Sequence, residues 1–226
     1  MGRIAMTIEH HVSDDLLIAY GAGTLDEAMS LLVATHLALC PACRAALELA
    51  EIVGGVLIDS APPGAALDEA LLEAAVSRPD REDNREDTRQ DIPPAATGPF
   101  VLPRPLRDRA GGDIAGLAWR SVGGGIRQVP LVADGPGATA RLLLIPAGKS
   151  VPAHGHRGFE ATLVLAGSFY DRGSWHRRGD VGIADPFVVH QPAAGPEEDC
   201  ICLAVTDARL KFQAPIPRLL QPFHGI

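Results

Sequence analysis

The stretch HLALCPACRAALELA, residues 36–50, constrains the N-terminal part of this chain more than any other sequence feature. His36 precedes Cys40 by four residues, and Cys43 follows three residues later. The flanking residues favour a helix, and on a continuous or nearly continuous helix this spacing places all three side chains on one face. Three soft or borderline ligands then point at one volume, and zinc prefers four such ligands in a tetrahedron.

The fourth ligand is expected from the segment before the first helix, where His10 and His11 are neighbours. The 24 residues between His11 and His36 are enough for a helical hairpin, so either histidine can fold back. Two thiolates and two neutral imidazoles make a closed, neutral site with a structural role. A redox CxxC pair and a pair of core cysteines are the alternatives. A redox pair normally opens a helix after a strand, and neither alternative explains His36.

A second set of metal-binding residue types lies in the stretch GKSVPAHGHRGFEATLVLAG, residues 148–167. His154 and His156 alternate, so on a strand both face one side of the sheet, and Glu160 follows at even spacing. His190 ends a later strand-like segment. Three imidazoles and a carboxylate inside a small barrel predict a site for Zn, Mn, Fe or Ni. The alternative is a surface HxH pair with an unrelated third histidine.

Three further residues stand near this pattern. His176 lies among turn residues and arginines, which predicts a surface histidine. Cys200 and Cys202 alternate on a predicted strand, so both face one side. We expect them to pack in the barrel wall, too far apart for a comfortable bond to each other. If they face the metal cavity instead, they are sensitive to oxidation.

The N-terminal quarter is predicted to be helical. One helix is expected after Ser13, and a second over residues 25–39, starting from a capping box at Thr24–Glu27. A third helix is expected from Pro41 to the pair Gly54-Gly55, and a fourth over residues 66–76.

The composition then changes twice. Residues 77–99 are highly charged, with four prolines and almost no apolar side chain, which predicts a linker. From about Leu102 onward, short apolar runs alternate with Gly and Pro turns, which predicts a β-sandwich or barrel.

The charge balance and the N-terminus exclude several classes of protein. A net charge of −8 opposes direct binding to nucleic acid, which requires clustered Lys and Arg. The first residues lack the apolar segment of a secretory signal, and no run of about 18 apolar residues predicts a membrane span. We therefore expect a cytoplasmic protein with no membrane partner, whose four cysteines are metal ligands or free thiols.

These motifs together resemble a known family. Residues 148–167 and 179–190 resemble the two cupin motifs, and the segment H-x24-H-x3-C-x2-C resembles the zinc anti-sigma domain. Apart from the linker, nearly the whole chain resembles the ChrR-type anti-sigma factors, which join the two domains. The resemblance implies an α+β multidomain protein with an all-α zinc-binding domain over 1–76, a flexible linker over 77–99 and a cupin β-barrel (jelly roll) over 100–226. It implies zinc on His11, His36, Cys40 and Cys43, and zinc or another divalent metal on His154, His156, Glu160 and His190.

The resemblance also implies a function. In this family the helices bind an extracytoplasmic-function sigma factor and mask its polymerase-binding surfaces, and the cupin domain is needed to respond to singlet oxygen or related oxidants. We therefore expect an anti-sigma factor and not an enzyme. Apolar helical residues such as Leu16, Leu32 and Leu71 either contact the sigma factor or form the domain's own core. The alternative is a metal-dependent cupin enzyme, a dioxygenase or isomerase, although a minimal cupin enzyme has no place for the zinc module.

Overall fold

The computed structural model describes residues 7–62, 69–77, 100–132, 138–207 and 211–212. Residues 1–52 and 100–226 form one compact unit, and residues 53–99 form a second. The helices are α1 (Asp14–Gly21), α2 (Glu27–Leu39), α3 (Pro41–Ser60), α4 (Glu69–Val76) and α5 (Arg104–Ala110), followed by the short 3-10 helix η1 (Ile114–Gly116).

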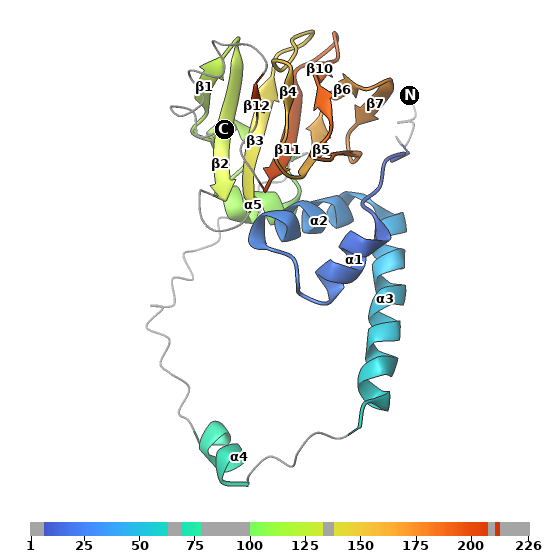
Figure 1. Ribbon diagram of the computed structural model, residues 1–226. Helices are drawn as coiled ribbons and strands as arrows, with labels where there is room; N and C mark the ends of the chain where they lie inside the picture. Colours follow the sequence, from blue (N-terminus) through green and yellow to red (C-terminus); the bar gives the residue numbers. More distant parts are fainter. Residues whose placement is uncertain (1–6, 63–68, 78–99, 133–137, 208–210, 213–226) are drawn as a thin grey trace, which may run out of the picture. The chain divides into compact units, whose positions relative to one another are not determined.

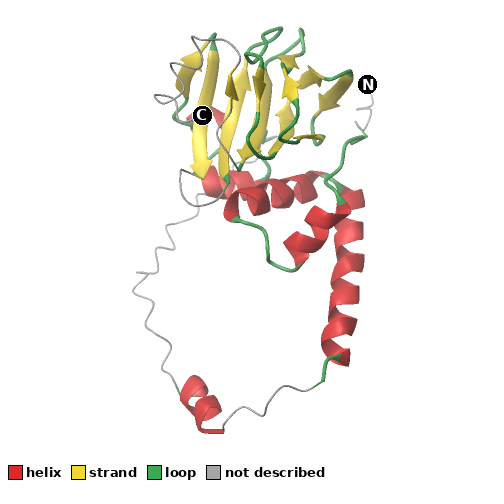
Figure 2. Ribbon diagram, in the orientation of Figure 1, coloured by secondary structure: helices red, strands yellow, loops and turns green. Residues whose placement is uncertain are grey.

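The strands follow the helices in the chain (Figures 1 and 2). They are β1 (Arg120–Gly123), β2 (Ile126–Val132), β3 (Thr139–Ile145), β4 (His154–Gly155), β5 (Glu160–Ala166), β6 (Ser168–Asp171), β7 (Ser174–Arg177), β8 (Val181–Ala184), β9 (Val189–His190), β10 (Ala193–Ala194), β11 (Cys200–Thr206) and β12 (Lys211–Phe212).

Hydrogen bonds divide the described strands among three sheets. The large sheet has the order β1-β2-β3-β11-β5-β8, and the small sheets have the orders β10-β6-β7 and β12-β4-β9. Each pairing between described strands is antiparallel, as the sandwich or barrel prediction requires. The predicted cupin-like β architecture is therefore confirmed, although these strands do not close into one continuous barrel.

One hydrophobic core joins α1, α2, the first turns of α3 and α5 to the large sheet. Leu32 of α2 and Leu106 of α5 are fully buried in the same cluster as Leu163 of β5. Side chains alternate along a strand, so Val164 points to the other face, where it packs with Phe169 of β6 in a second cluster. The large sheet thus has one face covered by helices and an opposite face directed toward the interior of the β domain.

The start of α2 differs from the sequence prediction. The side chain of Asp26 caps this helix by accepting the N–H of Met29 at 2.9 Å. The hydroxyl of Thr24 instead donates to the carbonyl oxygen of Ala19 at 3.1 Å. The predicted capping box at Thr24–Glu27 is therefore wrong: the preceding turn already uses Thr24, and an Asp two residues later supplies an equally good acceptor.

The end of α3 also differs from the prediction. The helix continues through Gly54-Gly55 and ends at Ser60, just before Ala61-Pro62. An interior glycine costs a helix about 1 kcal/mol relative to alanine, which apolar helix-forming neighbours can offset. A proline, in contrast, disfavours the helical conformation of the residue before it.

Two other helical segments bear on the predictions. α5 and η1 precede the first strand, where the sequence predicted strands alone. α4 lies within the predicted helix over 66–76, whose first residues, 66–68, lie outside the described residues. Apart from residue 77, the predicted linker also lies outside them.

None of the helices in the described part of the chain is by itself long and apolar enough to cross a membrane. α2 and α3 satisfy the length and composition criteria only when combined, and they are bent by 117° relative to each other.

The Asp26 cap provides a test of the helical assignment. We expect Asp26→Ala to lower the free energy of unfolding by about 1 kcal/mol, because the first turn of α2 loses the acceptor for an amide. Urea denaturation measures this change, with Glu198→Ala, an exposed position on the β domain, as the control. Equal stability of the two variants would contradict the capping role.

Candidate metal centres

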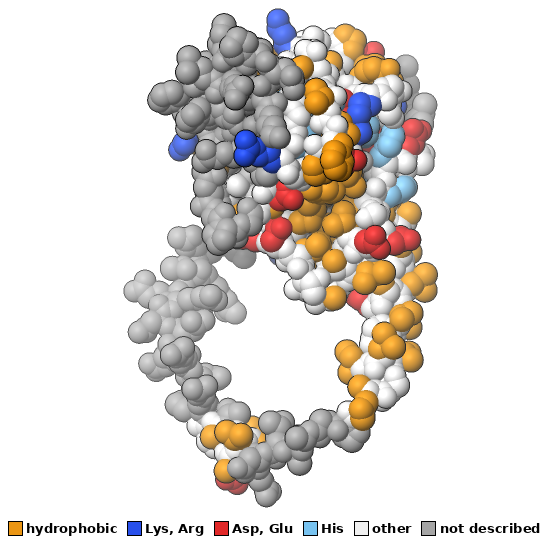
Figure 3. Space-filling model, viewed as in Figure 1, with side chains coloured by type: hydrophobic (Ala, Val, Ile, Leu, Met, Phe, Trp, Pro, Cys, Tyr) orange, Lys and Arg blue, Asp and Glu red, His pale blue; other side chains and the backbone are white. Residues whose placement is uncertain are grey.

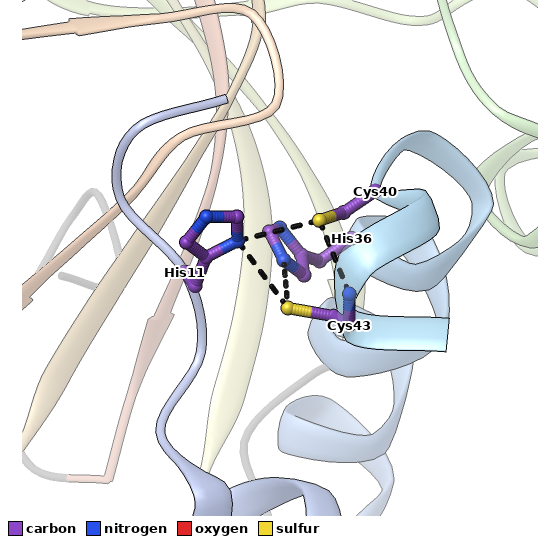
Figure 4. Close-up of side chains that lie close together, drawn as sticks. All are labelled: His11, His36, Cys40 and Cys43. Carbon is purple, nitrogen blue, oxygen red and sulfur yellow. Dashed lines mark hydrogen bonds between the residues drawn. The ribbon is translucent and has the colours of Figure 1, made fainter. Parts of the chain in front are cut away.

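Four side chains from the N-terminal arm (residues 8–12) and the α2–α3 corner converge in one cluster (Figure 4). Nδ1 of His11 lies 3.3 Å from Sγ of Cys40 and 3.4 Å from Sγ of Cys43. Nε2 of His36 lies 3.2 Å from Sγ of Cys43. All four ligand atoms lie within 4.8 Å of one another. The structure thus brings together the four residues that the sequence predicted as zinc ligands.

The helix that carries these ligands is broken, not continuous. Cys40 is the C-cap of α2 and has an extended backbone, and Pro41 begins α3. The ring of a proline clashes with a helical conformation of the preceding residue, which explains the bend at Cys40. The bend brings Cys40 and Cys43 to the same side as His36, so the local motif positions three ligands at a corner between two helices.

The donor set and its geometry fit a tetrahedral zinc ion. Zn–S bonds of about 2.3 Å and Zn–N bonds of about 2.0–2.1 Å place nitrogen and sulfur ligands roughly 3.6 Å apart. The nitrogen–sulfur distances between His11, His36 and the two thiols are 3.2–3.4 Å. Two thiolates would neutralise the charge of the ion, so the site can be closed, with three buried ligands and an exposed His11.

The protonation states in this cluster also suit a metal. Burial raises the pKa of the Cys43 thiol to about 12, and the adjacent Cys40 thiol adds to the rise, so a thiolate here needs a cation. Burial lowers the pKa of His36 and favours its neutral form. Nδ1 of His36 donates to the carbonyl oxygen of Gly179 at 2.9 Å, which leaves the Nε2 lone pair facing the thiols.

His10 and His11 lie in different surroundings, although they are neighbours in the sequence. His10 points away from the thiols: its Nε2 lies 2.9 Å from Oγ of Ser174, and its ring stacks on His176 with centroids 4.2 Å apart. Of the two histidines that spacing alone left open, the structure places His11 in the cluster.

The second predicted set also converges, inside the β domain. Nε2 of His190 lies 2.9 Å from Nε2 of His156 and 3.1 Å from Nε2 of His154. Oε2 of Glu160 lies 3.2 Å from Nε2 of His190 and 3.3 Å from Nε2 of His156. The four residues are buried, and their ligand atoms lie within 4.8 Å of one another. Since β4 pairs with β9, His154 and His190 are direct cross-strand neighbours.

Hydrogen bonds orient two of these imidazoles. Nδ1 of His154 donates to the carbonyl oxygen of Pro152, and Nδ1 of His190 donates to Oδ2 of Asp171, both at 2.8 Å. In each ring Nε2 is then the nitrogen that faces the centre. Nitrogen and carboxylate ligands of this type suit Zn, Mn, Fe or Ni, so the geometry fits a divalent cation without selecting one.

The charges in this site are strongly coupled. Burial by itself raises the pKa of the Glu160 carboxyl, but hydrogen bonds with His154 and His190 outweigh it and lower the pKa to about 2. Burial by itself lowers the pKa of His190, but hydrogen bonds with Asp171 and Glu160 raise the pKa to about 9. A proton on His190 and a metal ion at the centre therefore compete to neutralise the same carboxylate.

Asp171 is a site residue that the sequence analysis did not select. It ends β6, is 7% exposed, and holds the ligand His190 in the orientation described above. A sequence signal for it was present, because Asp171 lies two residues after the apolar Phe169 in a predicted strand, and side chains two residues apart share one face. That pattern places a carboxylate at an inward-facing strand position, where a buried charge requires a partner.

The predicted surface position of His176 is wrong. His176 is buried, and its ring stacks against Phe169 with centroids 4.6 Å apart on one side and against His10 on the other. Burial lowers its pKa. The N-terminal arm covers this hairpin, and local sequence around His176 cannot report a contact so distant along the chain.

Cys200 and Cys202 are buried free thiols. They pack with Val164 and Phe169 on the interior face of the large sheet, so the expected packing role is confirmed. The hydrogen bond with Cys200 and burial raise the pKa of Cys202 far above its usual range, and the charge of Glu160 adds to this effect. Cys202 therefore lies on the same interior face as Glu160 of the candidate metal cluster.

Comparisons with known proteins match both halves of the chain. A zinc-finger family model matches residues 11–44, and the ChrR cupin-like domain matches residues 107–209. The anti-sigma-E factor ChrR of Cereibacter sphaeroides is 48% identical over 221 residues, which cover 98% of this chain and 100% of that protein. The crystal structure of Rhodobacter sphaeroides SigE in complex with the anti-sigma ChrR contains a chain that is 45% identical and superposes with a TM-score of 0.72. That match covers 89% of this chain and 100% of the other.

The Asp171–His190 hydrogen bond is testable by metal titration. We expect Asp171→Ala to weaken divalent metal binding at the β-domain site by roughly 10- to 100-fold, because His190 loses the acceptor that orients it. Asp171→Asn keeps one acceptor oxygen, so its effect should be smaller. Mn²⁺ is the suitable probe because it avoids thiolate ligands, and electron paramagnetic resonance measures the free ion.

The matched control is Asp185→Ala, which removes an exposed carboxylate after β8 that accepts the N–H of Phe187. Equal Mn²⁺ affinity for the Asp171 and Asp185 variants would show that the hydrogen bond to His190 does not support metal binding.

Proposed function

This chain belongs to the ChrR family of anti-sigma factors, and on that premise we propose that it binds and inhibits an extracytoplasmic-function sigma factor. The observation that carries the proposal is the alignment at 48% identity with an anti-sigma factor along the full length of that protein. The match includes the helical cluster as well as the cupin-like domain, which favours a regulator over a metal-dependent dioxygenase or isomerase.

The surface of α3 supports this proposal. Leu49, Ile52, Val53, Val56 and Leu57 are each at least 59% exposed, and their spacing places them along one face of the helix. Figure 3 shows hydrophobic side chains continuing along α3. A helix face of this kind is typical of a surface that a partner helix covers. We propose that the sigma factor buries it.

The earlier apolar candidates divide between the core and the surface. Leu32 is buried in the shared core and Leu16 packs against it partly buried, so both serve the fold. Leu71 and Leu72 of α4 are more than half exposed and remain available for a partner.

We assign a structural zinc ion to the N-terminal cluster. Ligated by His11, His36, Cys40 and Cys43, it would hold α2 and α3 at a defined corner and thereby orient the exposed face of α3. His154, His156, Glu160 and His190 would hold zinc or another divalent ion in the β domain. There the chain supplies a buried carboxylate, two oriented imidazoles and the thiol of Cys202, whose pKa the charge of Glu160 helps to raise.

We further propose that this β-domain site senses oxidative stress of the singlet-oxygen type and causes release of the sigma factor. The location of both clusters in one compact unit supports such communication. A sigma factor acts on RNA polymerase, so a cytoplasmic location follows from the proposal, as does a protein partner in place of nucleic acid.

The α3 face predicts a binding hot spot. We expect Ile52→Glu to weaken the complex with the sigma factor roughly 30-fold or more, as for the loss of about 2 kcal/mol at a central apolar contact. The matched control is Ile58→Glu, because Ile58 is exposed but lies on the opposite side of the helix at about 100° per residue. Isothermal titration calorimetry with a purified extracytoplasmic-function sigma factor measures both. If Ile52→Glu bound as tightly as Ile58→Glu, the assigned face would be incorrect.

The sensing role predicts a separation of binding from release. We expect His154→Ala to keep normal affinity for the sigma factor, because His154 is buried inside the β domain and the proposed binding face lies on the exposed surface of α3, while release after singlet-oxygen exposure fails. Co-purification before and after illumination with a photosensitiser measures both properties. Loss of sigma binding in His154→Ala without oxidant would contradict the proposed division of labour.

A further inference from the structure

We propose that the turn Arg177–Val181 of the β domain is the outer support of the N-terminal metal site, with Asp180 as its positioning residue. This turn binds the backbone just before His11 and accepts a hydrogen bond from His36, so it positions both histidine ligands of that site. The turn would support metal binding whatever the protein regulates, and only its effect on release of the sigma factor rests on the proposed function.

Asp180 binds the backbone of the N-terminal arm. Its Oδ1 accepts the N–H of Glu9 at 2.8 Å and the N–H of His10 at 3.0 Å, while its Oδ2 accepts the N–H of Arg177 at 2.8 Å. Asp180 is 2% exposed, so these hydrogen bonds replace water at a buried carboxylate. They tie the two residues before His11 to the turn.

The turn binds the arm at two further points. The N–H of Val181 donates to the carbonyl oxygen of His10 at 3.0 Å. Ile8 packs directly on Gly179, because a methyl group added to this glycine would lie 2.5 Å from Cδ1 of Ile8. These contacts fix which residue of the arm lies against which residue of the turn. In this register Nδ1 of His11 points at the thiols of Cys40 and Cys43.

The same turn orients the second histidine ligand. The carbonyl oxygen of Gly179 accepts a hydrogen bond from Nδ1 of His36. This bond selects the tautomer with its proton on Nδ1 and its free lone pair on Nε2, which faces Cys43. A carbonyl acceptor behind a histidine ligand is a common way of raising metal affinity, and removing such support typically costs 10- to 100-fold. Here one five-residue turn of the β domain supports both histidines of a cluster whose cysteines lie on α2 and α3.

Because linkage is reciprocal, a metal ion bound by His11 and His36 also stabilises the docking of the arm on the β domain. Displacement of the turn therefore withdraws support from the N-terminal site. Within the proposed function, this contact would let a change in the β domain loosen the α2–α3 corner.

Cobalt substitution tests the proposal in the full-length chain. Co²⁺ bound by Cys40 and Cys43 gives a thiolate-to-cobalt absorption band, which a site of three histidines and a glutamate does not give. We expect Asp180→Ala to weaken Co²⁺ binding measured by this band by 10-fold or more and to shift the ligand-field bands as His11 leaves the tetrahedron. Asp180→Asn, which keeps one acceptor oxygen, should fall between Asp180→Ala and the unmodified protein. Asp185→Ala should bind like the unmodified protein.

A second pair of variants approaches the same contact from the backbone. Gly179 and Gly123 have left-handed φ angles of +95° and +99°. An added methyl group meets Ile8 at position 179 but no described atom within 4 Å at position 123. Both alanine variants therefore carry similar backbone strain, and only Gly179→Ala also removes the space that the Ile8 side chain of the arm occupies. We expect Gly179→Ala to weaken Co²⁺ binding at least 10-fold relative to Gly123→Ala.

Near-ultraviolet circular dichroism checks that each variant remains folded, and each pair of variants tests the contact if the other does not fold. Co²⁺ affinities of Asp180→Ala and Gly179→Ala equal to those of their controls would overturn the proposal. Failure of the proposed function has a different signature, because the unmodified, metal-loaded chain would then form no complex with the sigma factor.

Discussion

The packing of α2 against the large sheet determines where both clusters lie. Leu32 of α2 is fully buried with Leu163 and Leu203 of the sheet, and full burial of a leucine stabilises the folded chain by about 1.5–3 kcal/mol. The same helix presents His36 next to the turn before β8, while β5 carries Glu160 at its first residue. One shared core thus sets the position of a sulfur-containing cluster and of an imidazole–carboxylate cluster. Residues 1–52 and 100–226 accordingly form one compact unit, whereas the domain boundaries at 76 and 100 stay predictions.

The parts of the site that depend on local spacing were predictable from the sequence. Cys40 and Cys43 lie on either side of a helix start, and His36 lies one turn earlier, so the corner assembles from adjacent residues. His154 and Glu160 likewise belong to one short motif whose alternation directs side chains inward. The helical N-terminal part and the antiparallel β domain followed from apolar periodicity and from the distribution of glycine and proline.

The parts that depend on distant contacts were not predictable in this way. The choice between His10 and His11 depends on Asp180, which lies 170 residues from His10. The same arm buries His176, whose local sequence suggested the surface. Asp171 supports a ligand 19 residues away in a different sheet. The prediction of the α2 cap failed for another reason. Thr24 and Asp26 are both good acceptors, and only the path of the preceding turn decides which of them caps the helix.

The N-terminal arm binds a turn before β8 that the ribosome synthesises much later than the arm itself. The hydrogen bonds of Glu9, His10 and His36 to this region join residues 143 to 171 positions apart. All four ligands of the N-terminal cluster have been synthesised once Cys43 is made, but the turn that supports His11 and His36 is synthesised only when translation reaches Asp180. Under the proposed support, the amino-terminal centre reaches its full metal affinity only after the β domain has been synthesised and has folded around the arm.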